Sequence, residues 1–90
     1  MPKHLNSIDQ LVAARMRAFR KAIGLTQTAV AAEIGVSFQQ LQKYETGTNR
    51  ICASRLFALS KVLQVPISAF FPDGAEEIVP SFESIADPVA

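Results

Sequence analysis

The sequence predicts an all-α fold, on two observations. The apolar residues between positions 8 and 23 recur every three or four residues, which is the period of an amphipathic helix. Further along, hydroxyl residues that can cap a helix are followed by glycines that can end one, as in the pairs Thr26 with Gly35 and Ser37 with Gly47. No stretch gives a convincing strand pattern. Ninety residues suit one small domain with a modest core.

The first predicted helix spans residues 8–23. Ser7, with Gln10 three residues later, has the spacing of a capping box, and Gly24 is a natural stop. The apolar residues expected to face the core on this helix are Ile8, Leu11, Val12, Met16, Phe19 and Ile23.

Four more helices follow in the prediction. The second lies between Thr26 and Gly35, and the third runs from the Ser37 cap to about residue 46. After a polar loop, Leu56, Leu59, Val62 and Leu63 predict a fourth helix over residues 53–64. Pro66 favours the start of a short fifth helix that carries Ile67, Phe70 and Phe71.

Charge divides the chain into a basic unit and an acidic tail. Residues 1–71 hold nine Lys and Arg against three Asp and Glu, a charge of +6, whereas residues 72–90 hold five acidic residues and no basic one, a charge of −5. We therefore expect an N-terminal arm (1–7), a folded domain (8–71) and an acidic C-terminal tail (72–90). A basic domain favours a polyanionic partner.

Composition argues against several other classes. No apolar stretch approaches the ~20 residues of a membrane span, and the N-terminus lacks the apolar block of a signal peptide. We expect a cytoplasmic protein. The single histidine, His4, and the single cysteine, Cys52, offer neither a clustered metal site nor an obvious catalytic pair. We expect no enzyme activity and no cofactor.

The segment Gly35-Val36-Ser37 predicts a helix-turn-helix. Two helices joined by so short a turn must cross at a steep angle. A small residue, Ala31, stands where the backbones approach, and Gly35 tolerates a positive φ in the turn. The apolar residues expected to fill the shared interior are Val30, Ile34, Val36, Leu41 and Tyr44.

The stretch RMRAFRKAIGLTQTAVAAEIGVSFQQLQKYETG resembles the Cro/phage-repressor type of helix-turn-helix, or XRE family. The resemblance rests on Arg20, Gly24-Leu25-Thr26-Gln27, Ala31, Gly35-Val36-Ser37 and Glu45-Thr46-Gly47, and it covers residues 8–71. It implies a five-helix, lambda-repressor-like domain that binds DNA. It also implies a partly buried salt bridge between Arg20 and Glu45, which would give Arg20 a structural role.

By helical spacing, one face of the third helix lies opposite Leu41 and Tyr44. The side chains on this face are suited to contact bases. Glutamine can bond adenine, lysine can reach guanine, and phenylalanine can touch a thymine methyl in the major groove. The residues of this face that match the usual base contacts of the family are Phe38, Gln39, Gln42 and Lys43. The competing interpretation is a solvated face, with Phe38 packed on the domain flank.

Contacts with DNA phosphates are expected on both sides of this helix. The start of the second helix, at Gln27 and Thr28, offers free N–H groups, and Gln27 adds its side-chain amide. The loop after the third helix offers Thr48, Asn49 and Arg50. Gln27 is also a phosphate contact by resemblance. Arg17, Arg55 and Lys61 are further candidates for phosphate contacts, with plain solvated charge as the alternative for each.

The sequence departs from the family pattern at three positions. Val30 stands where leucine is common, and Gln42 stands where a small residue is frequent, so a base preference cannot be carried over. Cys52 stands where serine or proline would be expected. A thiol is a poor cap, and we expect a semi-buried, reduced cysteine and not a redox sensor.

These features predict a sequence-specific double-stranded DNA-binding regulator of transcription, a repressor that binds a palindromic operator as a homodimer. Ile67, Phe70 and Phe71 are the expected dimer surface, with capping of the core as the alternative; residues 78–85 could extend it. One rival is an antitoxin that represses its own operon and binds a toxin through its tail. The other is a protein-interaction module that does not contact DNA.

Overall fold

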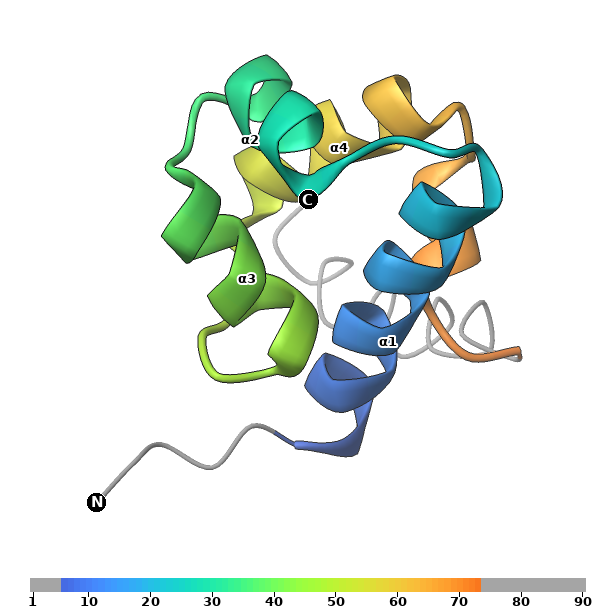
Figure 1. Cartoon of the computed structure of the whole chain (residues 1–90). Coiled ribbons are helices and arrows are strands. Elements are labelled where there is room, and N and C mark those ends of the chain that lie inside the picture. Colours follow the sequence, from blue (N-terminus) through green and yellow to red (C-terminus); the bar gives the residue numbers. More distant parts are fainter. Residues whose placement is uncertain (1–5, 74–90) are drawn as a thin grey trace, which may run out of the picture.

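The computed structural model describes residues 6–73 and confirms the all-α class (Figure 1). Within these residues there are four α-helices, a terminal 3-10 helix and no strand. The helices are α1 (Ser7–Ala22), α2 (Gln27–Ile34), α3 (Phe38–Thr46), α4 (Ala53–Leu63) and the 3-10 helix η1 (Ile67–Phe70). The expected fifth helix is therefore a four-residue 3-10 helix. The expected N-terminal arm and acidic tail lie largely outside the described residues.

The start of α1 differs from the prediction. The cap is Asn6, whose side-chain oxygen accepts from the Asp9 backbone N–H at 2.8 Å, while the Asp9 carboxylate accepts from the Asn6 backbone N–H at 3.3 Å. The expected box of Ser7 and Gln10 is wrong by one residue. An ionised carboxylate in the first turn also interacts favourably with the positive end of the helix dipole, which the Gln10 amide cannot do.

The caps of the two central helices are those the sequence predicts. Thr26 Oγ1 accepts from the Ala29 N–H at 3.1 Å, and Ser37 Oγ accepts from the Gln40 N–H at 3.0 Å. Gly35 ends α2 with φ at +77°, a conformation that costs other L-residues about 1–2 kcal/mol. This glycine lets the chain reverse within three residues, so α3 crosses α2 as the tight turn requires (Figure 1).

The core lies where the helices meet. Val30, Leu41 and Phe70 are 0% exposed. The buried apolar cluster as a whole comprises Val12, Met16, Val30, Ala31, Ile34, Leu41, Leu56, Leu59, Leu63 and Phe70. The inward-facing residues predicted on α2 and α4 are confirmed, except that Val62 is only partly buried.

Two residues of the predicted apolar face of the first helix are exposed instead. Ile8 is 41% exposed and Ile23 is 49% exposed. Ile8 lies in the first turn of α1 and Ile23 is its C-terminal cap, so both stand at the ends of the stretch that packs against its neighbours. The helical period predicts on which side of a helix a residue lies. It does not predict how far along the helix the neighbouring elements cover that side.

The 3-10 helix η1 closes one end of the core. The Phe70 ring packs edge to face against Phe19, with centroids 5.6 Å apart. Arg15 Nη1 donates to the carbonyl oxygens of Ala69 at 3.0 Å and Phe71 at 2.6 Å, which ties the end of η1 to α1. The expectation that Phe70 lies on a dimer surface is wrong, because its side chain is fully buried and caps the core. Phe71 is half-buried.

Both ends of α4 lack an ideal capping residue. Cys52 occupies the N-cap position and makes no side-chain cap hydrogen bond, as expected of a thiol. The expectation that it is semi-buried is wrong, since Cys52 is exposed. At the other end Gln64, predicted to be the last helical residue, is the C-cap and has φ at +61°. No helix among residues 6–73 is long and apolar enough to cross a membrane.

Candidate nucleic-acid interface

The third helix presents one exposed polar face. Leu41 is fully buried, and Tyr44 is half-buried on the same side of α3. The other side carries the predicted base-reading face, which we define as Phe38, Gln39, Gln42 and Lys43, and all four side chains are exposed. Phe38 is 39% exposed, so part of its ring is available at the surface.

A buried ion pair holds α3 against α1. Arg20 Nε donates to Glu45 Oε2 at 2.7 Å, and Arg20 Nη2 donates to Glu45 Oε1 at 3.0 Å. The two side chains are only 11% and 2% exposed. Arg20 Nη1 also donates to the Leu25 carbonyl at 2.8 Å. This fork geometry joins the end of α1, the turn before α2 and the end of α3, as the family resemblance implies.

The same carboxylate positions a predicted phosphate contact. Gln27 Nε2 donates to Glu45 Oε1 at 2.9 Å, and Gln27 Oε1 receives a long contact of 3.5 Å from Gln42 Nε2. An amide nitrogen carries two hydrogens. Gln27 therefore keeps one N–H free for an anion while Glu45 fixes its orientation. Sequence reasoning missed this link between α2 and α3.

The loop after α3 is also tied down. The Thr48 and Asn49 backbone N–H groups donate to the Lys43 carbonyl at 2.9 and 3.2 Å, so only their side chains remain for a phosphate. Thr48 Oγ1 lies 2.9 Å from Thr46 Oγ1. Thr28 at the start of α2 is exposed, and Asn49 is half-buried.

Arg50, another predicted phosphate contact, is not free in this structure. Its Nε and Nη2 each lie 2.9 Å from Asp9 Oδ2, which joins the loop to the start of α1. The Arg50 side chain is nevertheless 59% exposed. An exposed pair of this kind contributes about 0–1 kcal/mol, so a phosphate can compete for the guanidinium at little cost.

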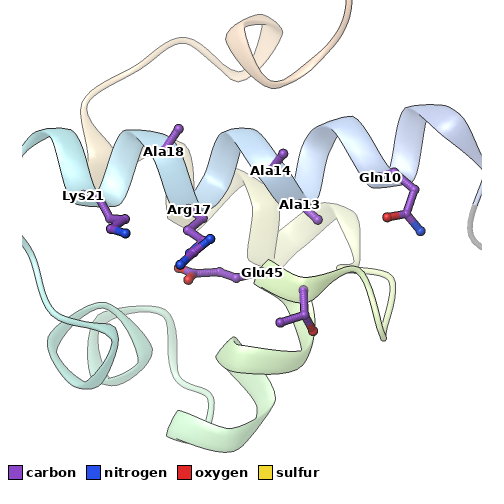
Figure 2. Close-up of a pocket in the computed structure, with 8 residues that line it drawn as sticks. Gln10, Ala13, Ala14, Arg17, Ala18, Lys21 and Glu45 are labelled. Carbon is purple, nitrogen blue, oxygen red and sulfur yellow. The ribbon is translucent and has the colours of Figure 1, made fainter.

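A groove runs between α1 and the C-terminal part of α3 (Figure 2). Gln10, Arg17 and Lys21 point from α1 toward α3, and the Glu45 side chain reaches back toward α1. The groove is open to solvent and has a volume of about 310 Å³. Its lining residues are Gln10, Ala13, Ala14, Arg17, Ala18, Lys21, Glu45 and Thr46.

Two surface features outside this interface were not predicted. Phe57 on α4 is 56% exposed, the largest value among the big apolar side chains of the described part, and Lys61 Nζ lies 5.1 Å from its ring centroid. The Cys52 thiol lies 3.4 Å from Ser54 Oγ, and this hydrogen bond is the main cause that lowers the Cys52 pKa below its ordinary value. The i, i+4 spacing of Phe57 and Lys61 could have indicated the first contact. Residues 6–73 contain no group of three potential metal ligands among His, Cys, Asp and Glu.

Comparison with known proteins supports the geometry. The profile of a helix-turn-helix family matches residues 16–70, more than half of the chain. The chain belongs to this family, in its XRE-type branch.

Several relatives of the family are similar over most of this chain. An uncharacterized HTH-type transcriptional regulator of Sinorhizobium medicae is 48% identical over 71 residues, which are 79% of this chain and 51% of that protein. An uncharacterized transcriptional regulator from the ATPase CF(0) region of Rhodospirillum rubrum is 52% identical over 69 residues, or 77% of this chain and 64% of that protein. The chain thus spans between half and two thirds of the length of these relatives.

A solved structure shares the fold. The P22 c2 repressor, crystallised in complex with a synthetic operator, superposes with a TM-score of 0.63 at 30% identity, covering 67% of this chain and 91% of that one. The match confirms the lambda-repressor-like arrangement of the helices.

Proposed function

We propose that this chain is the DNA-binding part of a transcriptional regulator, and that it recognises a specific double-stranded sequence by placing α3 in the major groove. The observation that carries the proposal is the exposed face of α3, where Gln39, Gln42 and Lys43 offer amide and ammonium groups to base edges. An adaptor that binds only proteins has no need of this set of groups. The relatives named as transcriptional regulators and the P22 c2 repressor support the same function.

The buried network supports the proposal because it holds the interface in one geometry. Glu45 fixes Arg20 on one side and Gln27 on the other, so α1, α2 and α3 present their groups together. Phosphate contacts set the register of a protein on DNA, and base contacts set the sequence. Here Gln27 would supply the first kind and the α3 face the second.

The electrostatic balance of the domain favours the same partner. Residues 6–73 hold eight Lys and Arg against four Asp and Glu, a formal charge of +4. Two of the acidic side chains, Asp9 and Glu45, are already paired with arginines. The domain thus presents a positive surface to a polyanion.

The finer proposal is a repressor that acts as a homodimer on a palindromic operator. One helix covers only a few base pairs, and a two-fold pair of such helices doubles the contacts at half-sites about one helical turn apart. Ile67, 40% exposed, remains available for the dimer contact, and Phe57 on the adjacent helix joins it as a candidate. The extension through residues 78–85 lies outside the described residues.

Selection of bound fragments from a genomic DNA library tests the function. The wild type should enrich a palindromic sequence, and the Gln39→Ala, Lys43→Ala double variant should lose that enrichment while it stays folded by circular dichroism. A Glu33→Ala variant serves as the matched surface control, since Glu33 is exposed on α2 and makes no side-chain hydrogen bond within residues 6–73. Failure of the wild type to enrich any sequence at moderate salt would contradict the proposal.

A further inference from the structure

We propose that Arg17 of α1 is an additional phosphate contact, which binds the DNA backbone beside α1, next to the phosphate that Gln27 would contact. This inference rests on the proposed DNA-binding function. It concerns a residue that the sequence left open between a phosphate contact and a solvated charge.

Arg17 stands where two cavities adjoin. The groove along α1 contains it, and a second cavity of about 730 Å³ is lined by Arg17, Gln27, Gln42, Glu45 and Thr46. Arg17, Glu45 and Thr46 belong to both. The second cavity therefore places Arg17 together with the predicted phosphate contact Gln27 and with Gln42 of the base-reading face. A strand whose phosphate reaches Gln27 passes the mouth of this cavity.

Within residues 6–73, Arg17 also has no hydrogen-bond partner of its own. Among the five arginines of residues 6–73, the other four each donate a hydrogen bond within the protein: Arg15 to η1 carbonyls, Arg20 to Glu45, Arg50 to Asp9 and Arg55 to the Gly35 carbonyl. Arg17 is exposed and makes none within that part of the chain. Its planar guanidinium is free to donate two parallel hydrogen bonds to a phosphate.

The local charge favours an anion at this point. Among residues 6–73, the one carboxylate that lines the two cavities belongs to Glu45, which is 2% exposed and bonded to Arg20. Lys21, one turn further along α1, points to the same side as Arg17 (Figure 2). The groove thus offers two exposed positive charges beside a carboxylate that is already neutralised. A phosphodiester is the anion that DNA brings to this position.

The salt dependence of DNA binding tests the assignment. A selected DNA fragment and an unrelated duplex are titrated by fluorescence anisotropy from 50 to 300 mM salt with the wild type and with Arg17→Gln. Loss of one phosphate contact should make the negative slope of log K against log salt shallower by about 0.9 for each bound protomer. It should also weaken binding about eightfold at 0.1 M salt. The loss should be equal on both duplexes, because a phosphate contact carries no sequence information.

Two further variants separate the possible outcomes. Arg17→Lys should keep the slope, because it keeps the charge. Gln39→Ala should lose discrimination between the duplexes but keep the slope.

A wild type that binds neither duplex would overturn both this inference and the proposed function. A wild type that binds DNA, with Arg17→Gln folded and unchanged in slope, would overturn the Arg17 assignment alone. A loss confined to the selected fragment would also overturn it, since Arg17 would then contact bases.

Discussion

The Arg20–Glu45 pair should be the most sensitive polar contact of the domain. In an Arg20→Met variant the Glu45 carboxylate, 2% exposed, would keep only one of the three hydrogen bonds that it makes within residues 6–73, the one from Gln27. Hydrogen bonds to charged groups contribute about 1.5–3 kcal/mol each, so two lost bonds correspond to about 3–6 kcal/mol. Loss of one partner of a buried pair typically costs about 3–5 kcal/mol, in agreement.

This cost is comparable with the whole stability of the domain. The 68 residues described here correspond to an unfolding free energy of about 3–10 kcal/mol. Arg20→Met is therefore expected to be partly or wholly unfolded at 37 °C. Urea denaturation followed by circular dichroism at 222 nm measures the loss directly.

A double-mutant cycle isolates the pair itself. The Arg20→Met, Glu45→Leu double variant removes both charges and fills the space with apolar side chains. Within residues 6–73 only the Leu25 carbonyl and the Gln27 amide lose a partner. Both residues are half-buried, so water can replace the lost bonds at less than the about 1–3 kcal/mol that each fully buried group would cost. The double variant should therefore be more stable than either single variant. A single variant that loses less than about 1 kcal/mol, or losses that simply add, would refute the reasoning.

Three further predictions concern positions outside this pair. Gln64→Gly should stabilise the domain by about 0.5–1 kcal/mol in urea denaturation, because glycine relieves the positive φ at the end of α4 at a smaller entropic cost; an unchanged or lower stability would contradict it. Cys52 should react with iodoacetamide at a lower pH than an ordinary thiol, because its pKa is lowered. Ser54→Ala should shift the pH midpoint of this alkylation upward, since it removes the hydrogen bond that lowers the pKa. Equal midpoints in the two proteins would show that the Ser54 contact has no effect. Phe57→Glu and Ile67→Glu should each dissociate the proposed homodimer in sedimentation velocity without loss of helicity, and a variant that remains dimeric would exclude that side chain from the interface.

The sequence by itself determined the local structure of the helix-turn-helix. Thr26, Ser37 and Gly35 act within three or four residues of themselves, so their spacing in the chain is also their spacing in space. Burial of Leu41 opposite an exposed Gln39 follows from the same local period. These contacts are set by chain geometry, and one sequence suffices to find them.

Tertiary structure decided the contacts that join distant residues. Gln27 and Glu45 are 18 positions apart, and Asp9 and Arg50 are 41 apart, so no local pattern gives either pairing. The same limit explains Phe70. An apolar residue on a short terminal helix can face the core or a partner, and only the packing of η1 against Phe19 shows that it faces the core. The neighbours of Arg17 likewise follow only from the packed fold, because the cavity that it lines has walls from α1, α2 and α3.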